Sequence, residues 1–122
     1  MVSSRRPDRK SLVFAGTARL PSASAGNELL VIELEVNCAK FVVKAVHISP
    51  PYGALKGLLE SALVGELMST VAETGIDAIS ESYFSPYRNA ARSALLKATE
   101  AFATFRKRQS PEDLRTHFQQ VE

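Results

Sequence analysis

The sequence is poor in the residues that most often carry disulfides, metals and redox chemistry. Its 122 residues include one cysteine, two histidines and no tryptophan. The single cysteine, Cys38, cannot form a disulfide within the chain or supply a metal site built from several thiolates. Lys40 is the only cation near it in sequence, so we interpret Cys38 as incidental to function. A lone cysteine suits a reducing compartment, and we expect a cytoplasmic protein.

Long apolar runs and strong charge imbalance are also missing. No run is long enough to cross a membrane, so we expect no membrane partner. The start resembles a signal peptide, but its apolar part is short and Arg19 interrupts it, which favours a strand. The formal net charge is +2, too small to predict a nucleic-acid partner. The basic residues near the start and at 106–108 are interpreted as a solvated tail and a helix C-terminus.

Sequence patterns that indicate a catalytic centre are absent too. There is no pattern of a catalytic triad, a Gly-rich phosphate loop or a metal cluster. Asp77 and Glu81 share a helical face, but the start of an exposed helix explains both. We therefore assign no catalytic residues, no metal site and no cofactor. His47 has no carboxylate partner nearby in sequence, and a lone histidine on a strand is more often a hydrogen-bonded core residue than a catalyst.

The first half of the chain has the two-residue period of β-strands. Residues 1–10 are predicted to be a disordered basic tail, and 11–20 to be a strand. The stretch "ELLVIELEVNCAKFVVKAVHI" predicts a hairpin. If Cys38 and Ala39 form its turn, Glu33 lies opposite Lys44 and His47 belongs to the inner face. The outer face would then still carry the apolar residues Leu29, Val31, Val42, Val46 and Ile48.

From Pro50 the apolar period changes to that of helices. A leucine-rich stripe predicts a first helix, with Gly65 as its C-terminal cap. "ELMSTVAETG" is ambiguous, and "IDAISESYF" predicts a short helix. The helix from Pro86 to about Lys107 should be the longest, and its alanines predict close packing. "SPEDLRTHFQQVE" predicts a last helix. Residues 11–122 therefore form a single α+β domain, a three-stranded antiparallel meander covered on one face by three or four helices.

Several segments together resemble a bacterial family of small uncharacterised proteins. They are "FAGTARLP", "LLESALVGE" and "IDAISESYFSPYRNAARSALLKATEAF", and the likeness covers residues 12–107. The family is a domain of unknown function, numbered 3870, and it implies no assigned activity. A more distant resemblance is to the NifU-like iron–sulfur scaffold fold. Its ligand cysteines would fall at "SPPYG" and "FSPYR", and neither stretch contains one. The resemblance therefore implies a NifU-like arrangement without the cluster chemistry.

The two Ser-Pro stretches are the most informative local feature. In the NifU-like arrangement they would be two helix N-termini that face each other. Helix N-termini carry unpaired N–H groups and partial positive charge, so a small anionic ligand is expected there. The candidate ligand-binding residues are His47, Ser49, Tyr52, Ser85, Tyr87 and Arg88. The simpler interpretation is that both serines cap helices, the prolines start them and the tyrosines pack with hydrated hydroxyl groups.

Two functions remain open from the sequence. The first is a non-catalytic binding or assembly module, a homodimer or higher homo-oligomer, because one helix layer cannot cover both faces of an apolar sheet. The second is a small-molecule enzyme that uses His47 with Tyr52 or Tyr87 as acid–base groups. The first is the preferred hypothesis, since the sequence lacks a paired carboxylate or an activated nucleophile.

Overall fold

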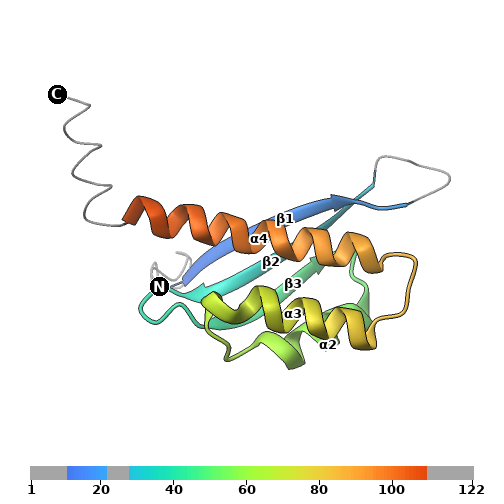
Figure 1. Cartoon of the computed structure of the whole chain (residues 1–122), viewed down its shortest axis with the longest axis horizontal. Coiled ribbons are helices and arrows are strands. Elements are labelled where there is room, and N and C mark those ends of the chain that lie inside the picture. Colours follow the sequence, from blue (N-terminus) through green and yellow to red (C-terminus); the bar gives the residue numbers. More distant parts are fainter. Residues whose placement is uncertain (1–10, 22–27, 110–122) are drawn as a thin grey trace, which may run out of the picture.

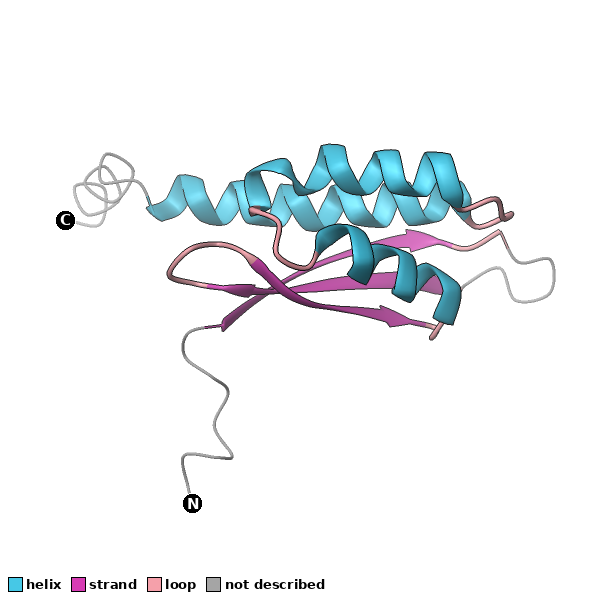
Figure 2. Cartoon of the chain, turned by 90° about the horizontal axis from the view of Figure 1, so that it is seen from below, coloured by secondary structure: helices cyan, strands magenta, loops and turns pink. Residues whose placement is uncertain are grey.

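The computed structural model describes residues 11–21 and 28–109, and in them three strands precede three helices. The elements are β1 (Ser11–Arg19), β2 (Leu29–Asn37), β3 (Val43–Ser49), α2 (Gly53–Leu63), α3 (Met68–Ser82) and α4 (Arg88–Gln109). Figure 1 shows the helices lying along the sheet, and Figure 2 shows that they form one layer on one side of it. The predicted tail, 1–10, and the predicted last helix, from 110, lie outside the described residues.

The strands form an antiparallel sheet in the order β1-β2-β3. Alternate residues of β2 point toward the helices: Leu30, Ile32, Leu34 and Val36 are all fully buried. Phe14 and Val46 flank Leu34 on the neighbouring strands and are buried with it. The predicted α+β class, the antiparallel meander and its single helix-covered face are thus confirmed. The other side, here called the open face, carries the alternate residues of β1 and β2, together with Lys44, Ala45, His47 and Ser49 of β3.

The predicted pairing of β2 with β3 is wrong. Glu33 lies opposite His47 instead of Lys44, and Val46 and Ile48 are buried under the helices. The cause is the connection between the strands, which runs over 38–42 and is longer than a two-residue turn. A register irregularity follows between Glu35 and Val36, because Val36 pairs with Val43 while Glu35 pairs with Ala45. The longer connection shifts the register by two residues, which leaves the faces unchanged, and the irregularity shifts it by one more, which reverses the face of every later residue in β3.

The asparagine at the end of β2 shapes this connection. The Asn37 side-chain oxygen accepts hydrogen bonds from the backbone N–H groups of Ala39 and Lys40, at 2.8 and 3.0 Å. Such an Asx turn replaces the Asn-Gly chemistry of a tight hairpin. Phe41 then adopts a left-handed backbone with φ of 57°. Its N–H donates to the Asn37 carbonyl oxygen at 2.7 Å, which closes the loop.

Helices α2 and α3 bury the leucine-rich stripe that the sequence predicts. Leu55, Leu59 and Leu63 are fully buried, and Gly65 follows the helix with φ of 95°, as expected of a glycine after a helix C-terminus. The ambiguous segment and the predicted short helix are in fact one helix, α3. Between the two helices, Val42 forms a bridge with Leu67, and the N–H of Val43 donates to the Glu66 carbonyl oxygen at 3.0 Å.

The longest described helix, α4, packs closely against β1, as its alanines predict. Ala91, Ala94 and Ala98 are fully buried, and β1 contributes Gly16 opposite them. A Cβ atom at Gly16 would lie 2.5 Å from the Ala98 nitrogen and even closer to the Ala94 carbonyl oxygen. Only a glycine leaves room for the helix backbone at this distance. Phe14 packs beside it against Phe102, with ring centroids 5.4 Å apart.

Candidate functional site

The two Ser-Pro stretches meet at one end of the molecule. Tyr52 precedes the first residue of α2, and Tyr87 precedes the first residue of α4. Their rings stack with centroids 5.1 Å apart and planes 4° apart. Both rings also pack against the hydrophobic core, as does Tyr83 at the end of α3. The three tyrosines of the sequence therefore gather where α2 and α4 begin and α3 ends.

The two serines differ in what they do at these helix starts. Ser85 Oγ accepts a hydrogen bond from the N–H of Tyr87 at 3.0 Å, in the turn that leads into α4. Ser49 is the last residue of β3 and pairs with Val31. The N-cap position of α2 is Tyr52, which has no side-chain capping bond. The expectation that Ser49 caps the helix is therefore wrong, because the two prolines and Tyr52 separate the strand from the helix.

The titration of the Tyr52 hydroxyl is shifted in the folded chain. Burial is the main cause that raises the pKa of the Tyr52 hydroxyl above 10.0. The charges that Tyr87 and Glu28 would carry, and a side-chain hydrogen bond with Tyr87, raise it further. All of these disfavour a phenolate at Tyr52. The Tyr52 hydroxyl is therefore a neutral donor or acceptor at physiological pH.

Arg88, the predicted anion-binding cation, is engaged within the chain. Its guanidinium donates a hydrogen bond to the backbone carbonyl oxygen of Ser80 and lies 4.9 Å from the centroid of the Phe84 ring. The neighbouring Arg92 donates to Ser80 Oγ at 3.0 Å. Both arginines thus hold the C-terminal turn of α3, where unpaired carbonyls favour cations. Arg88 Nε is buried and lacks a hydrogen-bond partner in the described part of the chain.

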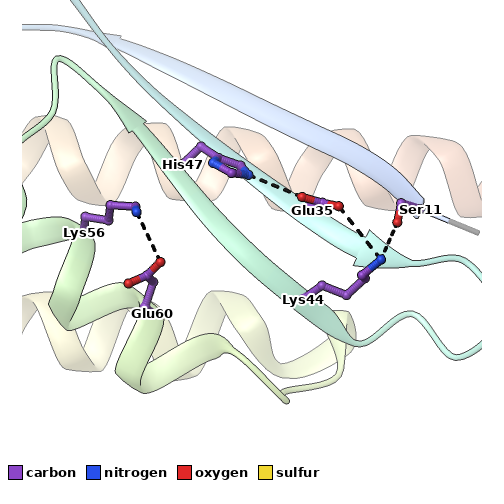
Figure 3. A network of polar contacts seen from close by, with 6 residues as sticks. All are labelled: Ser11, Glu35, Lys44, His47, Lys56 and Glu60. Atoms are coloured by element: carbon purple, nitrogen blue, oxygen red, sulfur yellow. Dashed lines mark hydrogen bonds and ion pairs between the residues drawn. The ribbon is translucent and has the colours of Figure 1, made fainter. Parts of the chain in front are cut away.

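His47 lies on the open face, apart from the stacked tyrosines. Its Nε2 is 3.3 Å from Glu35 Oε1, and Lys44 Nζ lies 3.9 Å from the other oxygen of the same carboxylate. Lys44 Nζ also donates to Ser11 Oγ at 2.6 Å, so the network joins all three strands (Figure 3). Lys56 and Glu60, drawn in the same view, form a separate ion pair along α2. The pattern of apolar residues does not indicate the His47–Glu35 pair, because that contact depends on the observed register of β3.

A shallow depression of about 310 Å³ lies beside His47. It is lined by Val31, Glu33, His47, Ile48 and Ser49. Two predicted site residues, His47 and Ser49, are therefore brought together here. The depression is not lined by the other four predicted residues, which lie instead where α2 and α4 begin: Tyr52, Ser85, Tyr87 and Arg88. The predicted set of six residues thus divides into two places, one on the open face and one at the helix starts.

Over residues 11–21 and 28–109, no three or more His, Cys, Asp and Glu side chains are grouped so that they could bind a metal ion. In the same residues, no helix combines the length and the apolar character needed to cross a bilayer. Comparison of the chain with protein-family models, curated proteins and solved structures found no match.

Proposed function

We propose that this protein is a non-catalytic binding and assembly module that forms a homodimer through the open face of its sheet. The observation that carries this proposal is the unequal covering of the sheet. All three described helices lie on one side, while the open face leaves Val13 and Leu29 56% and 49% exposed. Large apolar side chains on an uncovered sheet favour association with a second apolar surface.

The charges of the open face favour a second copy of the same chain as the partner. The acidic residues Glu33 and Glu35 lie on β2, while Lys44 and His47 lie on β3. A two-fold axis parallel to these strands and between them would place β2 of one copy over β3 of the other. The contact between an acidic strand and a basic strand would then occur twice, as a symmetric interface requires. Two sheets packed in this way lie about 10 Å apart.

The depression beside His47 fits this arrangement. It gives the apolar part of the open face a concave region next to Val31, into which an apolar side chain of a second copy can insert. In this proposal, His47 and Glu35 take part in recognition between subunits and not in proton transfer to a substrate.

The experiment is a mass measurement in solution, by light scattering or sedimentation, on the full chain and two variants. Leu29→Glu adds a charge to the open face, and Leu96→Glu adds the same charge to α4, where Leu96 is 43% exposed. We expect a dimer for the unchanged protein and for Leu96→Glu, and a monomer for Leu29→Glu. A monomeric mass for the unchanged protein at micromolar concentration would rule the proposal out.

The two other predicted functions stay hypotheses. An anionic ligand at the helix starts would have to bind beside the Tyr52–Tyr87 stack and draw on Arg88, which already bonds to Ser80. An enzyme that pairs His47 with a tyrosine would need those side chains together. His47 instead contacts Glu35 on the open face, while Tyr52 and Tyr87 pack against the core. These contacts favour the binding module over the enzyme.

A further inference from the structure

A second cavity lies at the end of the molecule opposite to the tyrosines. It has a volume of about 180 Å³ and lies between the β2–β3 connection, the start of α3 and the C-terminal part of α4. Its apolar lining comes from Phe41, Leu67, Met68 and Phe102. Two cations, Lys40 and Arg106, also line it. None of these residues belongs to the open face or to the helix starts with their Ser-Pro stretches.

The two cations of this cavity have no carboxylate partner in the described part of the chain. The ion pairs found there are formed by Lys44, His47 and Lys56, and none includes Lys40 or Arg106. The neighbouring carboxylate of Glu66 does not line the cavity, and it accepts a hydrogen bond from Thr70 Oγ1 at 2.7 Å. The cavity therefore has an uncompensated positive charge, which favours an anion.

Arg106 is positioned for this role by an aromatic ring. Its guanidinium carbon lies 4.8 Å from the centroid of the Phe41 ring. The N–H groups of a guanidinium point outward in its own plane, so they stay available when its face lies over a ring. They can then donate two parallel hydrogen bonds to one carboxylate. Lys40 adds a second charge with a flexible stem, which can follow the position of the bound group.

The apolar lining is held in place by an unusual backbone conformation. Phe41 has a φ of 57°, which a bulky residue seldom adopts and glycine or asparagine adopts more easily. Hydrogen bonds to Asn37 and from Met68, at 2.7 and 2.8 Å, fix this conformation. The Phe41 and Phe102 rings pack with centroids 5.5 Å apart. Beside them, Leu67 is 52% exposed, which leaves part of the apolar lining uncovered.

We propose that this cavity binds a small aromatic carboxylate. The carboxylate would contact Arg106 and Lys40, and the ring would lie against Phe41, Phe102 and Leu67. The volume fits this class of ligand, since an apolar cavity of about 150 Å³ holds a benzene ring. Charge decides between a neutral and an anionic ligand. Lys40 and Arg106, which line the cavity and have no carboxylate partner among the described residues, favour the anion.

The test uses the full chain and phenylacetate as the probe, followed by calorimetry or by amide chemical shifts. We expect binding in the millimolar range or tighter, with shifts at residues around Lys40 and Arg106. Neutral phenylacetamide, which has the same ring, should bind at least about tenfold more weakly, because a charged hydrogen bond contributes that much or more. Arg106→Gln should weaken phenylacetate binding by a similar factor.

The matched control is Arg108→Gln, which removes the same charge from an exposed arginine on α4 that does not line the cavity. It should bind phenylacetate like the unchanged protein. Lys40→Gln provides a second variant if Arg106→Gln fails to fold. The proposal is overturned if phenylacetate does not bind up to about 10 mM, or if phenylacetamide binds equally well. It is also overturned if binding responds to Arg88→Ala but not to Arg106→Gln, because the ligand would then lie at the helix starts.

Discussion

Tyr52 and Tyr87, which are 35 positions apart in the sequence, lie face to face with ring centroids 5.1 Å apart. This stack ties the start of α2 to the start of α4. Tyr83 follows the last residue of α3 and packs against the same hydrophobic core. Aromatic pairs contribute about 0.5–1.5 kcal/mol beyond the area they bury. The tyrosines of the two Ser-Pro stretches therefore have a structural role whether or not a ligand binds beside them.

The first prediction concerns the titration of Tyr52. Its raised pKa means that the folded chain holds this proton more tightly than the unfolded chain. The resulting stability is present below the unfolded pKa of about 10, and it is lost as the pH rises through the folded pKa. Unfolding free energies should therefore fall above about pH 10. Tyr87→Phe should bring the Tyr52 pKa closer to its ordinary value, while burial keeps it above that value.

Tyrosine absorbance at alkaline pH measures this directly, because phenolates absorb at longer wavelength than phenols. The chain has three tyrosines, so the titration has few components. Tyr52→Phe serves as the assignment control and should remove the last of them to ionise. If that variant removes an early component instead, the assignment of the raised pKa to Tyr52 is incorrect.

The second prediction compares two glycines. Gly16→Ala should destabilise the protein by about 1–3 kcal/mol or more, because its Cβ would collide with backbone atoms of Ala94 and Ala98. Gly57→Ala is the matched control: it lies on exposed α2 surface with no atom within 4 Å of the added Cβ. That change should stabilise the protein by about 0.4–1 kcal/mol. Denaturant unfolding of both variants would measure the effects, and equal values would contradict the close packing of α4 on β1.

The third prediction concerns the contacts by which Arg88 stabilises the end of α3. Arg88→Ala removes the hydrogen bond to the Ser80 carbonyl oxygen and the contact with the Phe84 ring. We expect a loss of about 1.5 kcal/mol in unfolding free energy, at the low end for a charged hydrogen bond because water can reach part of the site. Arg108→Ala, on the exposed end of α4, should change it by less than about 0.5 kcal/mol. Equal effects would show that Arg88 contributes only its charge.

The sequence predicts the strands and the main helix well, because their apolar periods are clear. In β2, the alternation of Leu30, Ile32, Leu34 and Val36 with polar residues determines which face is buried. The alanines of α4 likewise indicate a helix that approaches a sheet closely. These features depend on local periodicity, so neighbouring residues in sequence are enough to show them.

The features that the sequence predicts wrongly depend on contacts between distant parts of the fold, which a pattern of apolar residues does not show. The face on which His47 lies is determined by the irregularity at Lys44, which a pattern of apolar residues cannot locate. The continuity of α3 was obscured by Gly75, which is tolerated because it packs against the side chain of Leu95. The ligand role of Arg88 is predicted from its place at a helix start, whereas its contact with Ser80 depends on the packing of α4 against α3.

The bridge between Val42 and Leu67 has a consequence for aggregation. The outer edge of a sheet offers unpaired amide groups that can recruit strands from other molecules. At Val43 this edge is already occupied, since its N–H bonds to Glu66 and its carbonyl oxygen accepts from Gly65 at 2.9 Å. An incoming strand would have to displace the segment that leads into α3. Fibrous growth along this edge is thereby obstructed at its first step, while stacking of the sheets through their open faces is left unhindered.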